Sequence, residues 1–221
     1  MKRGLNAWAR YAIAVFAHHS GADSLYRKLS GGGLVVLMMH RLRDEHDPYP
    51  LSLSKSSFGK ITGWLRRRRI LVDMPSGLAA LDQPGHAKVS YALTFDDGYR
   101  DNLSLLDPAF ADASHQPVPA IVYVATRHVG QQPIWAYQLQ HALASHTRSR
   151  LDLGELGLGC FDLSQAFDHD RLYQLLPPRL KLLEPGQLQT WMDGIIDQLQ
   201  PHSLPAQGEM LEWSDIQALQ E

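Results

Sequence analysis

The sequence predicts an α/β fold with parallel strands, and two features of its hydrophobic pattern support this prediction. Short apolar runs bounded by turn-forming residues are typical of buried strands, and they occur at 34–39, 91–95 and 120–125. Stretches with helical spacing of apolar residues lie between them, at 54–69 and 99–110. Because strands and helices alternate along the chain, parallel strands joined by crossover segments are favoured.

The bulk composition is that of an ordinary globular protein. The chain has 221 residues, of which 44% are hydrophobic and 20% are charged. Its formal net charge of -2 provides no general attraction to nucleic acid, so we expect no nucleic-acid partner. Cys160 is the single cysteine, which excludes an internal disulfide and a metal site built from several cysteines.

Residues 1–30 are predicted to form an amphipathic helical segment. Its apolar stripe would consist of Trp8, Tyr11, Ile13 and Phe16. This stripe would either pack on the rest of the protein or contact a membrane surface. The apolar stretch 11–17 is short for a signal peptide and far below the roughly 20 residues of a spanning helix. We therefore expect a cytoplasmic protein, or one peripheral to the inner membrane.

The first predicted strand and helix are separated by a polar segment. Glycines at 31–33 end the N-terminal helical region, and we expect the strand 34–39 to be buried on both faces. The polar stretch 41–53 is predicted to be a loop. Ser54 or Ser57 would cap the next helix. The core face of that helix is predicted to contain Phe58, Ile61 and Leu65.

The second half of the chain has a different pattern, without strongly apolar strands. Residues 131–209 are predicted to be a mostly helical insertion that lies over one face of the main fold. Within it we expect a helix at 135–145, a small hairpin within 151–163, and helices at 171–176 and 187–199 that prolines separate. A last helix is predicted at 210–221, with Ser214 as its cap.

Two adjacent carboxylates, Asp96 and Asp97, directly follow the predicted strand 91–95. Sites in α/β folds form at the carboxyl ends of strands, and Gly98 permits a tight turn there. A bound cation would relieve the repulsion between the two charges. One carboxylate could then hold a divalent metal while the other acts as a base. The alternative is a simple turn with a helix cap.

Three blocks of sequence resemble the polysaccharide deacetylases with a NodB-type domain, also known as carbohydrate esterase family 4. The blocks are LMMHR at 37–41, LTFDDGYRDN at 93–102 and AIVYVAT at 120–126. They occur in the order that the family has. The segment 210–216 resembles, more weakly, a helix start in the same family.

The resemblance implies a distorted (β/α) barrel, present here in part. It also implies a divalent metal, usually zinc, and hydrolysis of an acetyl group on a sugar polymer. By residue, it assigns the general base to Asp96 and a metal ligand to Asp97. His40 matches a histidine at the end of the first strand, where it could line the substrate cleft. The alternative for His40 is a histidine that merely satisfies its hydrogen bonds at a strand end.

The family completes its metal site with two histidines four residues apart, and none of the 11 histidines here has that spacing. We therefore expect a chain that corresponds to the first part of the domain, truncated before this pair, with impaired activity. One alternative function is non-catalytic carbohydrate binding through aromatic residues such as Trp135 or Tyr137. Another is an aspartate-nucleophile phosphotransferase, which also places a carboxylate and a metal at a strand end.

Overall fold

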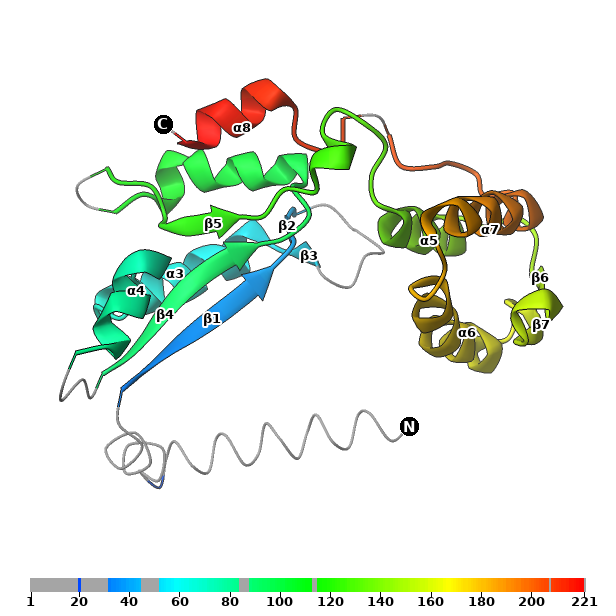
Figure 1. Ribbon diagram of the computed structural model, residues 1–221, viewed down its shortest axis with the longest axis horizontal. Helices are drawn as coiled ribbons and strands as arrows, with labels where there is room; N and C mark the ends of the chain where they lie inside the picture. The colour runs from blue at the N-terminus through cyan, green and yellow to red at the C-terminus, as the bar shows by residue number, and fades with distance from the viewer. Residues whose placement is uncertain are drawn as a thin grey trace. The chain divides into compact units, whose positions relative to one another are not determined.

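The computed structural model describes residues 20, 32–44, 52–83, 88–112, 115–206 and 208–220 (Figure 1). All but one of the residues of the predicted amphipathic segment 1–30 lie outside these ranges, and so does the suggested membrane contact. The chain divides into two compact units. The first comprises residues 1–39, 56–95 and 105–122, and the second comprises 40–55, 96–104 and 123–221.

A parallel sheet forms the centre of the first unit, as Figure 1 shows. Its strands are β1 (Gly33–Met39), β4 (Val89–Phe95) and β5 (Ala120–Val122), in the order β1-β4-β5. Both pairings are parallel, and Phe95 is in register with Met39 on one side and Val122 on the other. The predicted α/β class with parallel strands is confirmed. Among the described residues the sheet is open, and no closed barrel is formed.

The outer strands are less buried than the sequence predicted. The expectation that β1 is buried on both faces is wrong, since Val36 and Met38 are 46% and 63% exposed. Strand β5 ends at Val122 rather than at residue 125, and it is only half-buried. The reason is position: β4 has neighbours on both sides, whereas β1 and β5 are edge strands of this sheet. An apolar run does not distinguish a central strand from an edge strand.

Helix α3 (Lys55–Arg67) matches the predicted helix 54–69. Phe58 and Leu65 are buried as predicted, but Thr62 replaces Ile61 on the buried face. The Thr62 hydroxyl donates a hydrogen bond to the Phe58 carbonyl at 3.0 Å, which satisfies this group inside the protein. The ring of Phe58 lies edge-on to Phe95, with centroids 5.8 Å apart.

Helix α4 (Met74–Leu81) was not predicted, although its start has a recognisable signal. The Asp73 carboxylate accepts the Ser76 N–H at 2.8 Å and so caps the first turn. Pro75 lies within that turn, where the missing N–H is not needed. The sequence Asp-x-Pro could therefore have indicated this helix.

The predicted helix 99–110 is wrong in type. The segment forms two 3₁₀-helices, η1 (Arg100–Leu106) and η2 (Pro108–Phe110). Between them, Asp107 precedes a proline and has an extended backbone, with ψ at 123°. Because a residue before proline avoids the helical region, a continuous α-helix is interrupted at this point.

The helical part of the second unit agrees with the predicted insertion in its elements. It contains α5 (Trp135–Ala144), α6 (Ala166–Leu180) and α7 (Pro185–Leu199). An antiparallel hairpin of β6 (Arg150–Leu153) and β7 (Gly159–Asp162) completes it, with η4 (Gly154–Leu156) in the connection. Figure 1 shows these helices and the hairpin gathered together. They enclose an apolar core that includes Leu139, Leu143, Leu151, Leu153, Phe161, Leu172, Leu176 and Met192.

One detail of this insertion differs from the prediction. Prolines were expected to separate the two helices, but Pro177 and Pro178 lie inside α6, in its last turn. The helix therefore extends to Leu180 and buries that side chain in the core.

The remaining elements of the second unit are short. Strand β2 (Arg41–Leu42) pairs in parallel with β3 (Ser52–Leu53), so the prediction of a loop across 41–53 is wrong at both ends. A 3₁₀-turn, η3 (Thr126–His128), follows β5. None of the helices within the described ranges is long and apolar enough to cross a membrane.

Helix α8 (Trp213–Gln220) ends the described chain. The prediction that Ser214 caps it is wrong, because Ser214 lies inside the helix. Instead the carboxylate of Asp215 accepts the N–H of Glu212 at 2.9 Å. This is the reciprocal half of a capping box, in which the third residue of the helix satisfies the residue before its start.

Candidate functional site

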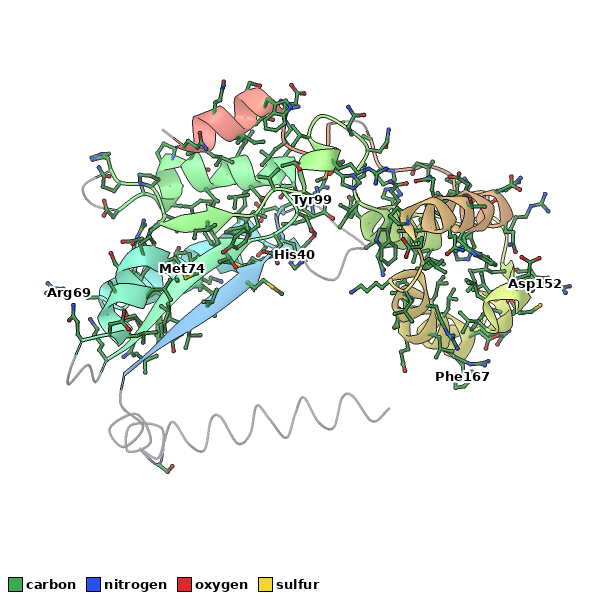
Figure 2. All side chains as sticks on the ribbon, viewed as in Figure 1. His40, Arg69, Met74, Tyr99, Asp152 and Phe167 are labelled. Atoms are coloured by element: carbon green, nitrogen blue, oxygen red, sulfur yellow. The ribbon has the colours of Figure 1, made fainter. Side chains whose placement is uncertain are left out.

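The predicted site residues follow two paired strands. His40 comes directly after β1, and Asp96 and Asp97 come directly after β4, whose last residues Met39 and Phe95 are partners in the sheet. All three lie in the second unit. The structure brings His40 and Asp97 together, with Nε2 and Oδ2 3.9 Å apart. Figure 2 labels His40, which follows β1, and Tyr99, which follows the turn at Asp97 and Gly98.

The turn at Asp97 and Gly98 has an unusual backbone. Both residues have positive φ angles, 75° at Asp97 and 79° at Gly98. For an aspartate this conformation is uncommon, and such strain is concentrated at functional sites. The carbonyl of Asp97 accepts the N–H of Ala125 at 3.2 Å, and that of Gly98 accepts the N–H of Leu211 at 2.9 Å. These bonds hold the turn in its strained form.

The space around Gly98 leaves no room for a side chain. A Cβ atom placed on it would lie 3.0 Å from Cγ1 of Val124 and 3.3 Å from the Val124 backbone. Both the positive φ and this close approach therefore require glycine at position 98.

The environment of Asp97 disfavours its negative charge. Burial raises the pKa of Asp97, and the neighbouring Asp96 carboxylate raises it further, while His40 and His128 lower it. A carboxylate that is desolvated, repelled by a second carboxylate and close to an imidazole is typical of a functional site. A cation bound at this position would stabilise the ionised form.

A buried guanidinium supports the same turn. Arg41 is 1% exposed, and its guanidinium lies between the rings of Tyr99 and Tyr137, at 4.6 Å and 4.4 Å from their centroids. Its Nη2 atom is 2.7 Å from Oδ2 of Asp101 and in close contact with Oε2 of Glu209. Such planar, charged contacts favour arginine over lysine.

This ion-pair network joins three segments of the chain. Burial by itself lowers the pKa of Arg41, but Asp101, Tyr137 and Glu209 raise it above its usual value, so the cation is permanent. Burial raises the pKa of Asp101, and Arg41 and the Leu42 N–H oppose that rise. The Leu42 N–H donates to Asp101 at 3.0 Å.

The segment that carries Asp101 also contacts the backbone of His40. The side-chain amide of Asn102 donates a hydrogen bond to the carbonyl of His40 at 2.9 Å. The position of His40 next to Asp97 therefore depends on the segment 99–102. Sequence reasoning did not identify Arg41, Asp101 or Asn102, although all three lie inside the quoted blocks. Glu209 had no sequence signal.

The resemblance implies a zinc ion, so the side chains of Asp97 and His40 can be compared with the ligands that zinc sites use. A carboxylate and an imidazole are both ligands that zinc accepts, but catalytic zinc sites use about three protein ligands. Across the described ranges, no group of three or more His, Cys, Asp or Glu side chains is arranged to hold a metal ion. Asp97 and His40 therefore fit zinc in chemical type but do not by themselves form a complete site.

The aromatic residues suggested for sugar binding have other roles. Tyr137 is 3% exposed, and its ring contacts Arg41 and Tyr99 rather than solvent. Trp135 is half-buried and packs against the helical core. Tyr137 therefore does not present a face on which a sugar could stack.

Comparisons with known proteins give no relatives for this chain. No protein-family model matches it, and no significant match was found among curated proteins or solved structures. The resemblance to polysaccharide deacetylases accordingly rests on the quoted residues alone.

Proposed function

We propose that this chain carries part of the active site of a metal-dependent hydrolase that removes acetyl groups from a sugar polymer. The observation that carries the proposal is the 3.9 Å approach of His40 to Asp97 in a strained turn after the sheet. A fold of the polysaccharide deacetylase type, with a partial (β/α) barrel, belongs to the same proposal. It is supported by the parallel order of β1, β4 and β5.

Each site residue has a role in the proposal. Asp97 is a ligand of a divalent cation, with zinc as the first candidate. His40 was expected to line the substrate cleft, and its distance from Asp97 makes it a candidate second ligand as well. Asp96 is the general base by resemblance. Its charge acts on Asp97, which is consistent with two carboxylates that share one site.

The proposal is tested by acetate release from an acetylated chito-oligosaccharide, with zinc in excess and at high protein concentration. Because two ligands replace the usual three, we expect little or no turnover from this chain. Any turnover should require zinc and should be lost in Asp96→Asn. The exposed Asp193 provides the matched control, Asp193→Asn. Acetate release that survives Asp96→Asn, or that a chelator leaves unchanged, would contradict the proposal.

A further inference from the structure

A groove in the second unit lies away from the residues discussed so far, between α7 and the turn that follows β6. Its volume is about 650 Å³, within the range of roughly 300–1,000 Å³ that is usual for small-molecule sites. The side chains and glycines that line it include Asp152, Glu155, Thr190, Trp191, Gly194 and Gln198. Figure 2 labels Asp152 on the hairpin side.

Trp191 provides an aromatic surface in this groove. Trp191 is partly buried against the apolar core and is also one of the residues that line the groove. Packing against the core restricts the rotamers of Trp191 before any ligand arrives. An indole ring can cover the C–H face of a sugar, and tryptophan is the best aromatic partner for an ammonium group.

Gly194 keeps the helix surface next to Trp191 bare. It lies in the exposed middle of α7, three residues after Trp191 and so on the same side of the helix. Glycine is a poor residue for a helix interior. A Cβ atom on Gly194 would meet nothing within 4 Å, so packing does not require glycine there. Its absence of a side chain leaves room for a ligand.

The opposite wall of the groove is anionic and rigid. Oδ1 of Asp152 accepts the N–H of Gly154 at 2.9 Å, and this bond lowers the pKa of Asp152 and keeps it charged. Gln198 binds the backbone of Asp152 twice, accepting its N–H at 2.8 Å and donating to its carbonyl at 3.1 Å. These bonds tie α7 to β6. Glu155 adds a second carboxylate.

We propose that this groove binds a segment of an amino-sugar polymer that carries free amino groups. A sugar ring would cover Trp191, and its ammonium group would face Asp152 and Glu155. The inference rests on the proposed function in one respect, namely that the ligand is a sugar polymer. Removal of an N-acetyl group leaves a primary amine, which is protonated in mildly acidic solution. The groove would thus hold the deacetylated part of such a polymer.

The test is isothermal titration of the chain in mildly acidic buffer, where the amines are protonated, with a glucosamine hexamer and, separately, with the N-acetylglucosamine hexamer. We expect binding of the glucosamine hexamer and at least about tenfold weaker binding of the acetylated one, because the ammonium contacts are lost. Gly194→Gln should fold normally, since space is free around it, and should weaken binding by about tenfold or more by filling the groove.

Matched variants separate the groove from the rest of the fold. Gly186→Gln changes another exposed glycine of α7 that also has no atom within 4 Å of a Cβ, and it should bind like the wild type. Asp152→Asn should lower affinity for the glucosamine hexamer. Trp191→Phe should also lower the affinity for this hexamer. Circular dichroism will show whether each variant is folded.

Several outcomes would overturn the inference. These are no binding, equal binding of both hexamers, unchanged binding by folded Gly194→Gln, or equally tight binding of a lysine oligopeptide. Asp97→Asn should leave groove binding unchanged, which separates the two proposals. Zinc binding that Asp97→Asn and His40→Gln weaken, without any groove binding, refutes this inference alone. Groove binding together with zinc affinity that both of these variants leave unchanged refutes the proposed function alone.

Discussion

Nη2 of Arg41 lies 2.7 Å from Oδ2 of Asp101, in an ion pair whose arginine is buried and whose aspartate is partly buried. It joins the residue after His40 to η1, which follows the turn that carries Asp96 and Asp97. The two partners are 60 residues apart in the sequence, and the second carboxylate of the network, Glu209, is 168 residues from Arg41. The arrangement of the candidate site therefore depends on long-range ion pairs.

The first prediction concerns Arg41. Arg41→Met keeps the length of the side chain but removes the cation that pairs with Asp101, and it leaves Glu209 with Arg43 as its remaining partner. We expect a loss of about 3–5 kcal/mol in the free energy of unfolding, measured by urea denaturation at neutral pH. The control is Arg100→Met, because Arg100 is exposed and pairs with Glu212 and Asp215 at 3.4 Å and 3.2 Å. It should lose less than about 1 kcal/mol. Equal losses would contradict the role of the buried network.

The second prediction concerns the strained turn. Gly98→Ala should destabilise the protein by about 1–3 kcal/mol, through the positive φ and the clash with Val124. Gly130→Ala is the matched control, since Gly130 has a φ of 65° but no atom within 4 Å of a Cβ. It should show the backbone cost alone, about 1–2 kcal/mol at most. Thermal unfolding of both variants measures the difference in stability. A smaller loss of stability in Gly98→Ala than in Gly130→Ala would show that the turn is not tightly packed.

The third prediction is the pH dependence of stability. Because the folded-state pKa of Asp97 is raised, the folded protein holds its proton at a pH where the unfolded chain has lost it. The resulting stability is complete below the unfolded pKa of about 4 and disappears as the pH rises through the folded pKa. Above that pH, Asp97→Asn should be more stable than the wild type, by about 0.5–2 kcal/mol.

Urea denaturation of both proteins between pH 4 and pH 8 checks this third prediction. Asparagine tolerates the left-handed backbone at least as well as aspartate, so strain does not obscure the comparison. The advantage of Asp97→Asn should shrink as the pH falls. An advantage that is constant with pH, or a loss of stability at neutral pH, would show that Asp97 is not destabilised by its surroundings.

Parts of the fold could be predicted from the sequence because they depend on local patterns. The apolar runs gave β1 and β4, and helical spacing gave α3, α5 and α7. Local patterns fail where neighbours decide the outcome. The exposure of Met38 follows from the edge position of β1. The break between η1 and η2 falls at Asp107, the residue before Pro108.

The candidate site was predictable only in its motif. Asp96 and Asp97 are visible because two carboxylates follow an apolar run, and His40 because it ends another. The proximity of His40 to Asp97 depends on how β1 and β4 pair, which the sequence does not state. The groove at Trp191 was not predicted at all, because it is formed by the hairpin and α7, which are far apart along the chain.

Zinc titration is the most direct test of the central claim, that Asp97 and His40 lie together as metal ligands. Calorimetric titration of the chain without an affinity tag should show weak binding at one site. Asp97→Asn and His40→Gln should each reduce the affinity by about tenfold or more. The exposed residues Asp193 and His202 provide the controls, Asp193→Asn and His202→Gln, which should bind like the wild type. Zinc affinity that is unchanged in both site variants would contradict the claim.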